Sequence, residues 1–231
     1  MALKRNICVS IADGNLERAL ELAAGAAGQA SVLEIRLDAL DRPVVAPFIE
    51  RLDVPLLFTC RPTWEGGGFA GTEEERFVLL EEAVRGGAAY VDVELRADEE
   101  LRQKLIGLSR KHRAKVIVSW HDFKTTASSQ ALQTIFQALY RSGADIGKIV
   151  TTARNFQDVL RVLALQESAY EMGFPLCAFC MGQAGMVSRI ATLELGGYMT
   201  YAAPDHGQIT ASGQLSLSKM LGALECFNEN P

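Results

Sequence analysis

The sequence predicts an α/β protein that folds as a single (β/α)8 barrel, the TIM-barrel architecture, over residues 1–231. Eight short apolar runs recur, and their starts lie 23 to 35 residues apart, which is the size of one strand-plus-helix unit. Several runs are almost continuously apolar, as in residues 116–118, and this is typical of parallel strands that are buried on both faces. The eight predicted strands are residues 6–11, 32–38, 55–61, 90–95, 115–123, 146–152, 175–181 and 199–203.

Helix signals fill the intervals between these strands. Thr72 and Glu75 have the spacing of a capping box, and two glycines follow that helix at residues 86–87. We predict one helix from an N-cap at Asn155 to residue 172, and a last helix over residues 215–226. An open, doubly wound sheet is the alternative fold, but residues 12–15 after the first strand lack its glycine-rich fingerprint.

Composition narrows the class of protein. The chain is 48% apolar and 22% charged, as in ordinary globular proteins, and its net charge of −5 offers no basic footprint for nucleic acid. No apolar run is long enough to span a membrane, and the first run is too short for a signal peptide, so we expect a cytoplasmic protein. Five cysteines are an odd count for a disulfide framework, and Cys177 and Cys180 would face opposite sides of a strand, so we interpret them as structural thiols.

Lys148 is the residue that points most directly to chemistry. It lies in the predicted strand 146–152 and shares a face with Ile146 and Val150. Burying an ammonium is costly, and desolvation lowers a lysine pKa, which gives a nucleophilic amine suited to Schiff-base formation. The alternative is a lysine at a strand end that pairs with a carboxylate such as Asp145 or reaches water.

His121 is the one histidine of three that ends a predicted buried strand. His112 belongs to a helix end and His206 to a turn, so a metal triad is not predicted and we expect no metal. The spacing of 27 residues places His121 and Lys148 on neighbouring strands, where an imidazole can act as base and then as acid for an imine. A histidine satisfied within the core is the alternative.

Further polar residues lie at or beyond predicted strand ends. Glu34 and Arg36 share one face of their strand, so they would pair with each other or bind a polar substrate. Arg61 and Arg189 have the fork that suits a carboxylate or phosphate, unless they are solvated surface residues. The glycine run 66–68 is a possible phosphate cradle, but it lacks the lysine and helix start of a P-loop, which favours a turn or lid.

Together these residues resemble the type I 3-dehydroquinate dehydratases. The resemblance extends almost from end to end, and its motifs are residues 34–38, 58–61, 65–67, 121–123, 143–148, 188–189 and 213–214. It implies dehydration of 3-dehydroquinate to 3-dehydroshikimate in the shikimate pathway, without a cofactor, by a homodimer.

The resemblance also implies roles for individual residues. Lys148 would form an imine with the C3 ketone, and His121 would remove a C2 proton and help the C1 hydroxyl leave as water. Glu65 would orient His121 and favour its charged form, and Arg189 would hold the substrate carboxylate. The remaining substrate-binding residues would be Ser10, Glu34, Arg36, Arg61, Thr210 and Gln214. The loop that carries Gln214 would close as a lid.

Two other functions remain open from sequence. One is another Schiff-base barrel enzyme, such as a class I aldolase that acts on a sugar phosphate. The other is a non-catalytic barrel that binds a small acid.

Overall fold

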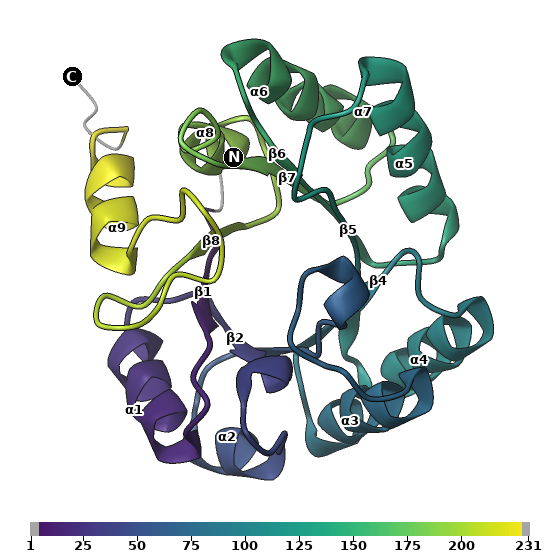
Figure 1. Ribbon diagram of the computed structural model, residues 1–231, viewed down its shortest axis with the longest axis vertical. Coiled ribbons are helices and arrows are strands. Elements are labelled where there is room, and N and C mark those ends of the chain that lie inside the picture. Colours follow the sequence, from purple (N-terminus) through teal and green to yellow (C-terminus); the bar gives the residue numbers. More distant parts are fainter. Residues whose placement is uncertain (1–4, 228–231) are drawn as a thin grey trace.

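The computed structural model describes residues 5–227. Eight parallel strands form an inner ring and the helices surround it, as Figure 1 shows in a view close to the barrel axis. The strands are β1 (Ile7–Ile11), β2 (Val32–Arg36), β3 (Leu56–Thr59), β4 (Tyr90–Glu94), β5 (Lys115–His121), β6 (Ile146–Thr152), β7 (Leu176–Met181) and β8 (Thr200–Ala202). The predicted barrel is confirmed over these residues, while residues 1–4 and 228–231 of the predicted domain lie outside them.

The strands are joined in the order β7-β6-β5-β4-β3-β2-β1-β8. Within the described residues no ladder joins β7 to β8, and the amide of Tyr198 crosses this seam to the carbonyl of Leu176 at 2.9 Å. The barrel is therefore nearly closed. Because β8 has only three residues, it offers few backbone groups with which to complete the ladder.

Helices follow the strands as predicted, with one correction. The helices are α1 (Leu16–Ala27), α2 (Ala46–Arg51), α3 (Glu73–Gly86), α4 (Glu99–His112), α5 (Ser129–Arg141), α6 (Phe156–Leu163), α7 (Leu165–Glu171), α8 (Ser188–Glu194) and α9 (Leu217–Glu225), with short 3-10 turns η1 (Leu37–Ala39) and η2 (Thr63–Glu65). The single helix predicted over 155–172 is wrong, since it divides into α6 and α7 at Ala164. The amide of Glu167 bonds to Ala164 three residues back, which tightens the turn and interrupts the regular helical ladder.

Helix caps fix the loops that lead to the strand ends. The capping box of Thr72 and Glu75 is present with both of its hydrogen bonds, and Gly87 ends α3 in the left-handed conformation. Asn155 caps α6 as predicted. No helix among the described residues is long and apolar enough to cross a membrane.

Side chains alternate between two apolar clusters along the strands. Ile146 and Val150 belong to the cluster inside the barrel, while Ile149 packs outward against the helices. Lys148 lines a pocket with Val150, so the prediction that these two residues share a face is confirmed. Cys177 faces inward and Cys180 outward, both as free, buried thiols. The inner cluster extends to the carboxyl ends of the strands, where Val150, Phe179, Met181 and Tyr201 meet polar side chains.

Candidate active site

A pocket opens at the carboxyl ends of the strands, where barrel enzymes carry their chemistry. Nine of the ten predicted site residues line it, and the tenth, Glu65, lies behind His121. The lining residues are Ser10, Glu34, Arg36, Arg61, Gly66, His121, Phe123, Lys148, Val150, Phe179, Met181, Arg189, Tyr201, Thr210, Ala211 and Gln214.

Lys148 is a buried cation in the wall of this pocket. Its Nζ donates to Asp92 Oδ2 at 3.1 Å and lies 3.8 Å from Glu34 Oε1. It also lies over the ring of Tyr201, 3.9 Å from the ring centroid. The alternative partner Asp145 is wrong, because that carboxylate accepts the amide of Val116 instead.

Glu34 is held by its neighbours across the strands. It accepts hydrogen bonds from the hydroxyls of Ser10 at 2.5 Å and Thr59 at 2.8 Å. The suggested pair between Glu34 and Arg36 is wrong, since Arg36 makes two hydrogen bonds to Asp38, at 2.9 and 2.6 Å. Asp38 is on η1, which follows β2 directly, so the chain turns back far enough for this pairing.

His121 is fixed at the end of β5 by Glu65. Oε1 of Glu65 lies 2.9 Å from Nδ1 of His121 and accepts the backbone amide of the same residue at 3.1 Å. Two hydrogen bonds from Arg96, at 3.0 and 2.8 Å, occupy the other carboxylate oxygen. Phe123 stacks on the imidazole with a ring-centroid distance of 5.8 Å.

The electrostatics favour a neutral imidazole. Burial, with the positive charges of Arg61 and Lys148, holds the pKa of His121 well below its usual range. Burial raises the pKa of Glu65 to about 7, against the lowering effect of Arg61 and Arg96. The resting imidazole is therefore neutral, and the expectation that Glu65 favours its charged form stays a prediction for the reacting enzyme. A neutral ring with its proton on Nδ1, facing the carboxylate, leaves Nε2 free as a base.

Arg61 belongs to a buried ion network that reaches Lys148. Its guanidinium donates to Asp92 at 2.9 Å, to Glu94 at 2.5 Å and to Ser119 at 2.8 Å. Burial opposes ionisation of Asp92, but Arg61 and Lys148 hold the pKa of its carboxyl below its usual range. Asp92 thus stays an anion between two cations.

Arg189 contrasts with Arg61. It is 1% exposed and lies over the ring of Phe179, and its hydrogen bonds to the carbonyls of Tyr201 and Ser212 are long, at 3.4 Å each. Its Nε has no partner and no carboxylate pairs with it among residues 5–227. Burial lowers the pKa of Arg189 to about 10, which still leaves it charged at neutral pH.

The glycine run at 66–68 forms a packed turn. All three amides donate within the protein, to Thr63 O, Pro62 O and Asp38 Oδ2. No amide of this run remains for a phosphate, so the cradle interpretation is wrong and the turn is confirmed.

Sequence reasoning missed several residues of the pocket. Tyr201, Phe179 and Met181 line it, and Asp92 holds the lysine. The sequence contained evidence for two of them. Strand alternation places Tyr201 on the same face as Met199, and Asp92 is a polar residue inside an apolar run. The part of the chain that the structure describes has no group of three or more His, Cys, Asp or Glu residues that could hold a metal.

The parallel eight-stranded barrel, with a polar pocket at the carboxyl ends of its strands, places this chain in the class of TIM-barrel proteins that carry their functional site at that end. Residues 7–231 match the family model of type I 3-dehydroquinase. The chain is 51% identical to the 3-dehydroquinate dehydratase of Desulfotalea psychrophila, over 94% of this chain and 96% of that protein. It therefore belongs to the type I 3-dehydroquinase family, and the predicted family and hydro-lyase class are confirmed.

Solved structures agree with this assignment. The 3-dehydroquinate dehydratase of Geobacillus kaustophilus has a TM-score of 0.87 and 27% identity, covering 98% of this chain and 93% of that chain. The type I enzyme of Clostridium difficile, solved with covalently modified comenic acid, has a TM-score of 0.85 and 25% identity, covering 96% and 91%.

Proposed function

We propose that this chain dehydrates 3-dehydroquinate to 3-dehydroshikimate in the shikimate pathway through an imine between Lys148 and the C3 carbonyl. The observation that carries this proposal is the position of Lys148. Its buried side chain donates a hydrogen bond to Asp92 and lines a pocket that also holds a neutral His121. An iminium withdraws electrons more strongly than a ketone, so it stabilises the enamine that forms when C2 loses a proton.

Asp92 serves the covalent step. Lys148 gives up one proton and attacks C3 as an amine. A second proton moves from its nitrogen to the carbinolamine oxygen, the first returns to that oxygen, and water leaves to give an iminium. The iminium nitrogen has the same charge as the resting ammonium, so the carboxylate 3.1 Å away can pair with the cation before and after the bond forms.

His121 moves the protons. Its Nε2 takes a proton from C2, and the enamine electrons then expel the C1 hydroxyl, which receives that proton and leaves as water. Glu65 accepts the Nδ1 hydrogen and stabilises the transient imidazolium. Hydrolysis of the iminium releases the product, so the net change is the loss of one water.

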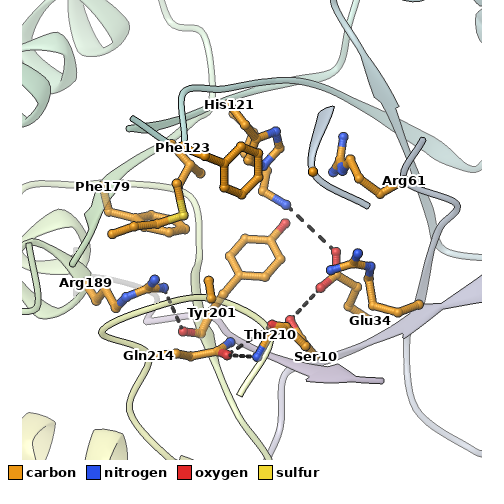
Figure 2. A pocket seen from close by; sticks show the side chains of 16 residues that line it. Ser10, Glu34, Arg61, His121, Phe123, Phe179, Arg189, Tyr201, Thr210 and Gln214 are labelled. Carbon is orange, nitrogen blue, oxygen red and sulfur yellow. Dashed lines mark hydrogen bonds and ion pairs between the residues drawn. The ribbon is translucent and has the colours of Figure 1, made fainter. Parts of the chain in front are cut away.

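Arg189 is the proposed carboxylate site. Figure 2 shows Arg189 and Glu34 on opposite sides of the pocket, with the ring of Tyr201 between them. An arginine whose hydrogen-bonding capacity is unfilled can accept an anion without breaking an ion pair. The hydroxyl-binding residues are proposed to be Ser10, Glu34, Arg36, Thr210 and Gln214, with Arg61 holding the network beneath them.

A sugar-phosphate aldolase is a weaker candidate. It needs a phosphate site, and the amides of the glycine turn are already bonded within the protein. A barrel that only binds a small acid would use Arg189 but would have no need of a buried lysine.

The test is reduction of the imine. We expect incubation with 3-dehydroquinate and borohydride to leave an adduct on Lys148, located by mass spectrometry of the peptides. Lys148→Ala should give neither adduct nor turnover, while His121→Ala should still be trapped but turn over at least 100-fold more slowly. Turnover by Lys148→Ala would rule out the imine, and binding by the wild type without turnover would favour the non-catalytic barrel.

Three further proposals concern the whole protein. One catalytic domain over residues 1–231 and a cytoplasmic location follow from the sequence pattern, and a homodimer is implied by the family resemblance. Light scattering of the purified protein at several concentrations tests the dimer, for which a monomer mass would be contradictory.

A further inference from the structure

Arg96 lies outside the pocket-lining residues but contacts the group that holds His121. It follows β4 in the chain, whereas Glu65 is the last residue of η2. We propose that Arg96 is a positioning residue that clamps Glu65 from outside the barrel and thereby keeps His121 in the tautomer that can accept a proton. This inference rests on the proposed function, because it assigns a role to Arg96 in that same reaction.

The contacts divide the carboxylate of Glu65 between two tasks. Oε1 faces His121, where it meets both Nδ1 and the backbone amide. Oε2 receives the Nε and Nη2 hydrogens of Arg96. Donors on both oxygens favour the ionised carboxylate and restrict its rotation, and an ionised Glu65 requires Nδ1 of His121 to be the donor toward it.

Arg96 is itself held in place although its side chain is 51% exposed. Its guanidinium lies 5.7 Å from the ring centroid of Trp64, which precedes Glu65 on the same 3-10 turn. An exposed ion pair usually contributes little because its side chains are mobile. Here the carboxylate is buried and the ring restrains the cation, so the pair is ordered from two sides.

Loss of this clamp has a predictable chemical consequence. A protonated Glu65 would donate to Nδ1 rather than accept from it, which would place the histidine hydrogen on Nε2 and remove the base. Burial already raises the pKa of Glu65 to about 7, and Arg96 is one of two cations that oppose this. The charged groups around the carboxylate are Arg96 after β4, Arg61 after β3, Glu94 on β4 and His121 on β5.

The experiment compares the pH dependence of kcat in four proteins: the wild type, Arg96→Met, Arg96→Lys and the control Arg85→Met. Arg85 is a similarly exposed arginine on α3 that pairs with Glu81, and neither residue lines the pocket or contacts Glu65. We expect the acid limb of Arg96→Met to move up by about 0.5 to 1 pH unit, less than a fully buried pair would give because Arg96 is half exposed. At pH values below the limb, kcat should then fall by about 3- to 10-fold.

The other variants separate charge from folding. Arg96→Lys should recover at least half of the shift, and Arg85→Met should follow the wild type. KM should change less than twofold in every variant, because Arg96 does not line the pocket. An acid limb of Arg96→Met that coincides with the wild type overturns the inference, as does an equal, pH-independent loss in both Arg96 variants.

A second measurement does not depend on turnover. The chain has three histidines, so 15N-histidine labelling gives few ring signals to assign. We expect His121 to carry its proton on Nδ1 at neutral pH in the wild type and to change state at a higher pH in Arg96→Met. Unchanged ring signals in the variant overturn the clamp. Absence of wild-type turnover would instead sink the proposed function, and the ring signals would still test the clamp.

Discussion

Arg189 is the cation with the most hydrogen-bonding capacity to spare in the pocket. Its Nε has no partner, and its two Nη contacts are long. We expect Arg189→Met to raise KM by about 10- to 100-fold, because the variant loses the binding free energy of a hydrogen-bonded charge pair with the substrate carboxylate. The effect on kcat should be small, because this contact is made equally in the ground and transition states.

Steady-state kinetics and thermal unfolding together check this role. Burying a guanidinium without an anion is costly, so Arg189→Met should unfold at the same temperature as the wild type or higher. Arg189→Lys should lie between the two in KM. An unchanged KM in Arg189→Met would place the carboxylate elsewhere in the pocket.

Tyr201 supplies an aromatic face to Lys148, and its hydroxyl is buried without a partner in the described structure. Tyr201→Phe keeps the face and removes the unsatisfied group. We expect it to raise the free energy of unfolding by about 0.5 to 1 kcal/mol, with unchanged kcat/KM. Urea denaturation and steady-state assays test this. A loss of kcat/KM of tenfold or more would contradict it and make the hydroxyl a contact of the substrate.

The η2 turn shows at the scale of one element how a glycine supports the catalytic histidine. Gly66 ends the turn with φ of 76°, and a Cβ there would lie 2.5 Å from the ring of Phe123, which stacks on His121. Gly173 has φ of 59° after α7, with open space where a Cβ would lie. Alanine therefore adds backbone strain at both positions but a steric clash only at the first.

We expect Gly173→Ala to cost about 1 kcal/mol of unfolding free energy and Gly66→Ala about 2 to 4 kcal/mol. Gly66→Ala should also lower kcat, because Phe123 must leave the imidazole. Denaturant titration of both variants is the measurement. Equal costs would mean that Phe123 moves aside freely and does not restrain His121.

The elements themselves were largely predictable from the sequence, because burial on both faces leaves an apolar run at each strand. The division of the helix at Ala164 was not, since the residues on both sides of it suit a helix and one tight hydrogen bond decides the break. The sequence predicted which polar residues lie at the strand ends, but it did not predict which of them form hydrogen bonds and ion pairs with one another. Arg61 is bonded within the protein to residues 31 to 58 positions away in the sequence, whereas Arg189 has no carboxylate partner. The sequence pattern does not distinguish these two arginines, because the difference depends on such long-range contacts.

The barrel as a whole has one weak seam, and the pocket lies across it. Phe179 and Met181 come from β7 and Tyr201 from β8, the two strands without a ladder between them. Past the strands, the seam is bridged by the carbonyl of Ser212, which accepts the amide of Gly182 at 3.1 Å and a hydrogen of Arg189. A substrate held by both Lys148 and the residues after β8 would join the two sides.

We therefore expect the reduced Lys148 adduct to slow backbone amide exchange chiefly at the seam. Residues 199–216 should slow by about tenfold, equal to about 1.4 kcal/mol of local stability, while residues 99–112 of α4, none of which lines the pocket, change little. Hydrogen exchange followed by mass spectrometry measures this, with borohydride-treated protein without substrate as the control. Equal slowing of both segments would indicate a general tightening of the barrel. No slowing at residues 199–216 would mean that the segment after β8 makes no contact with the bound substrate and does not act as a lid.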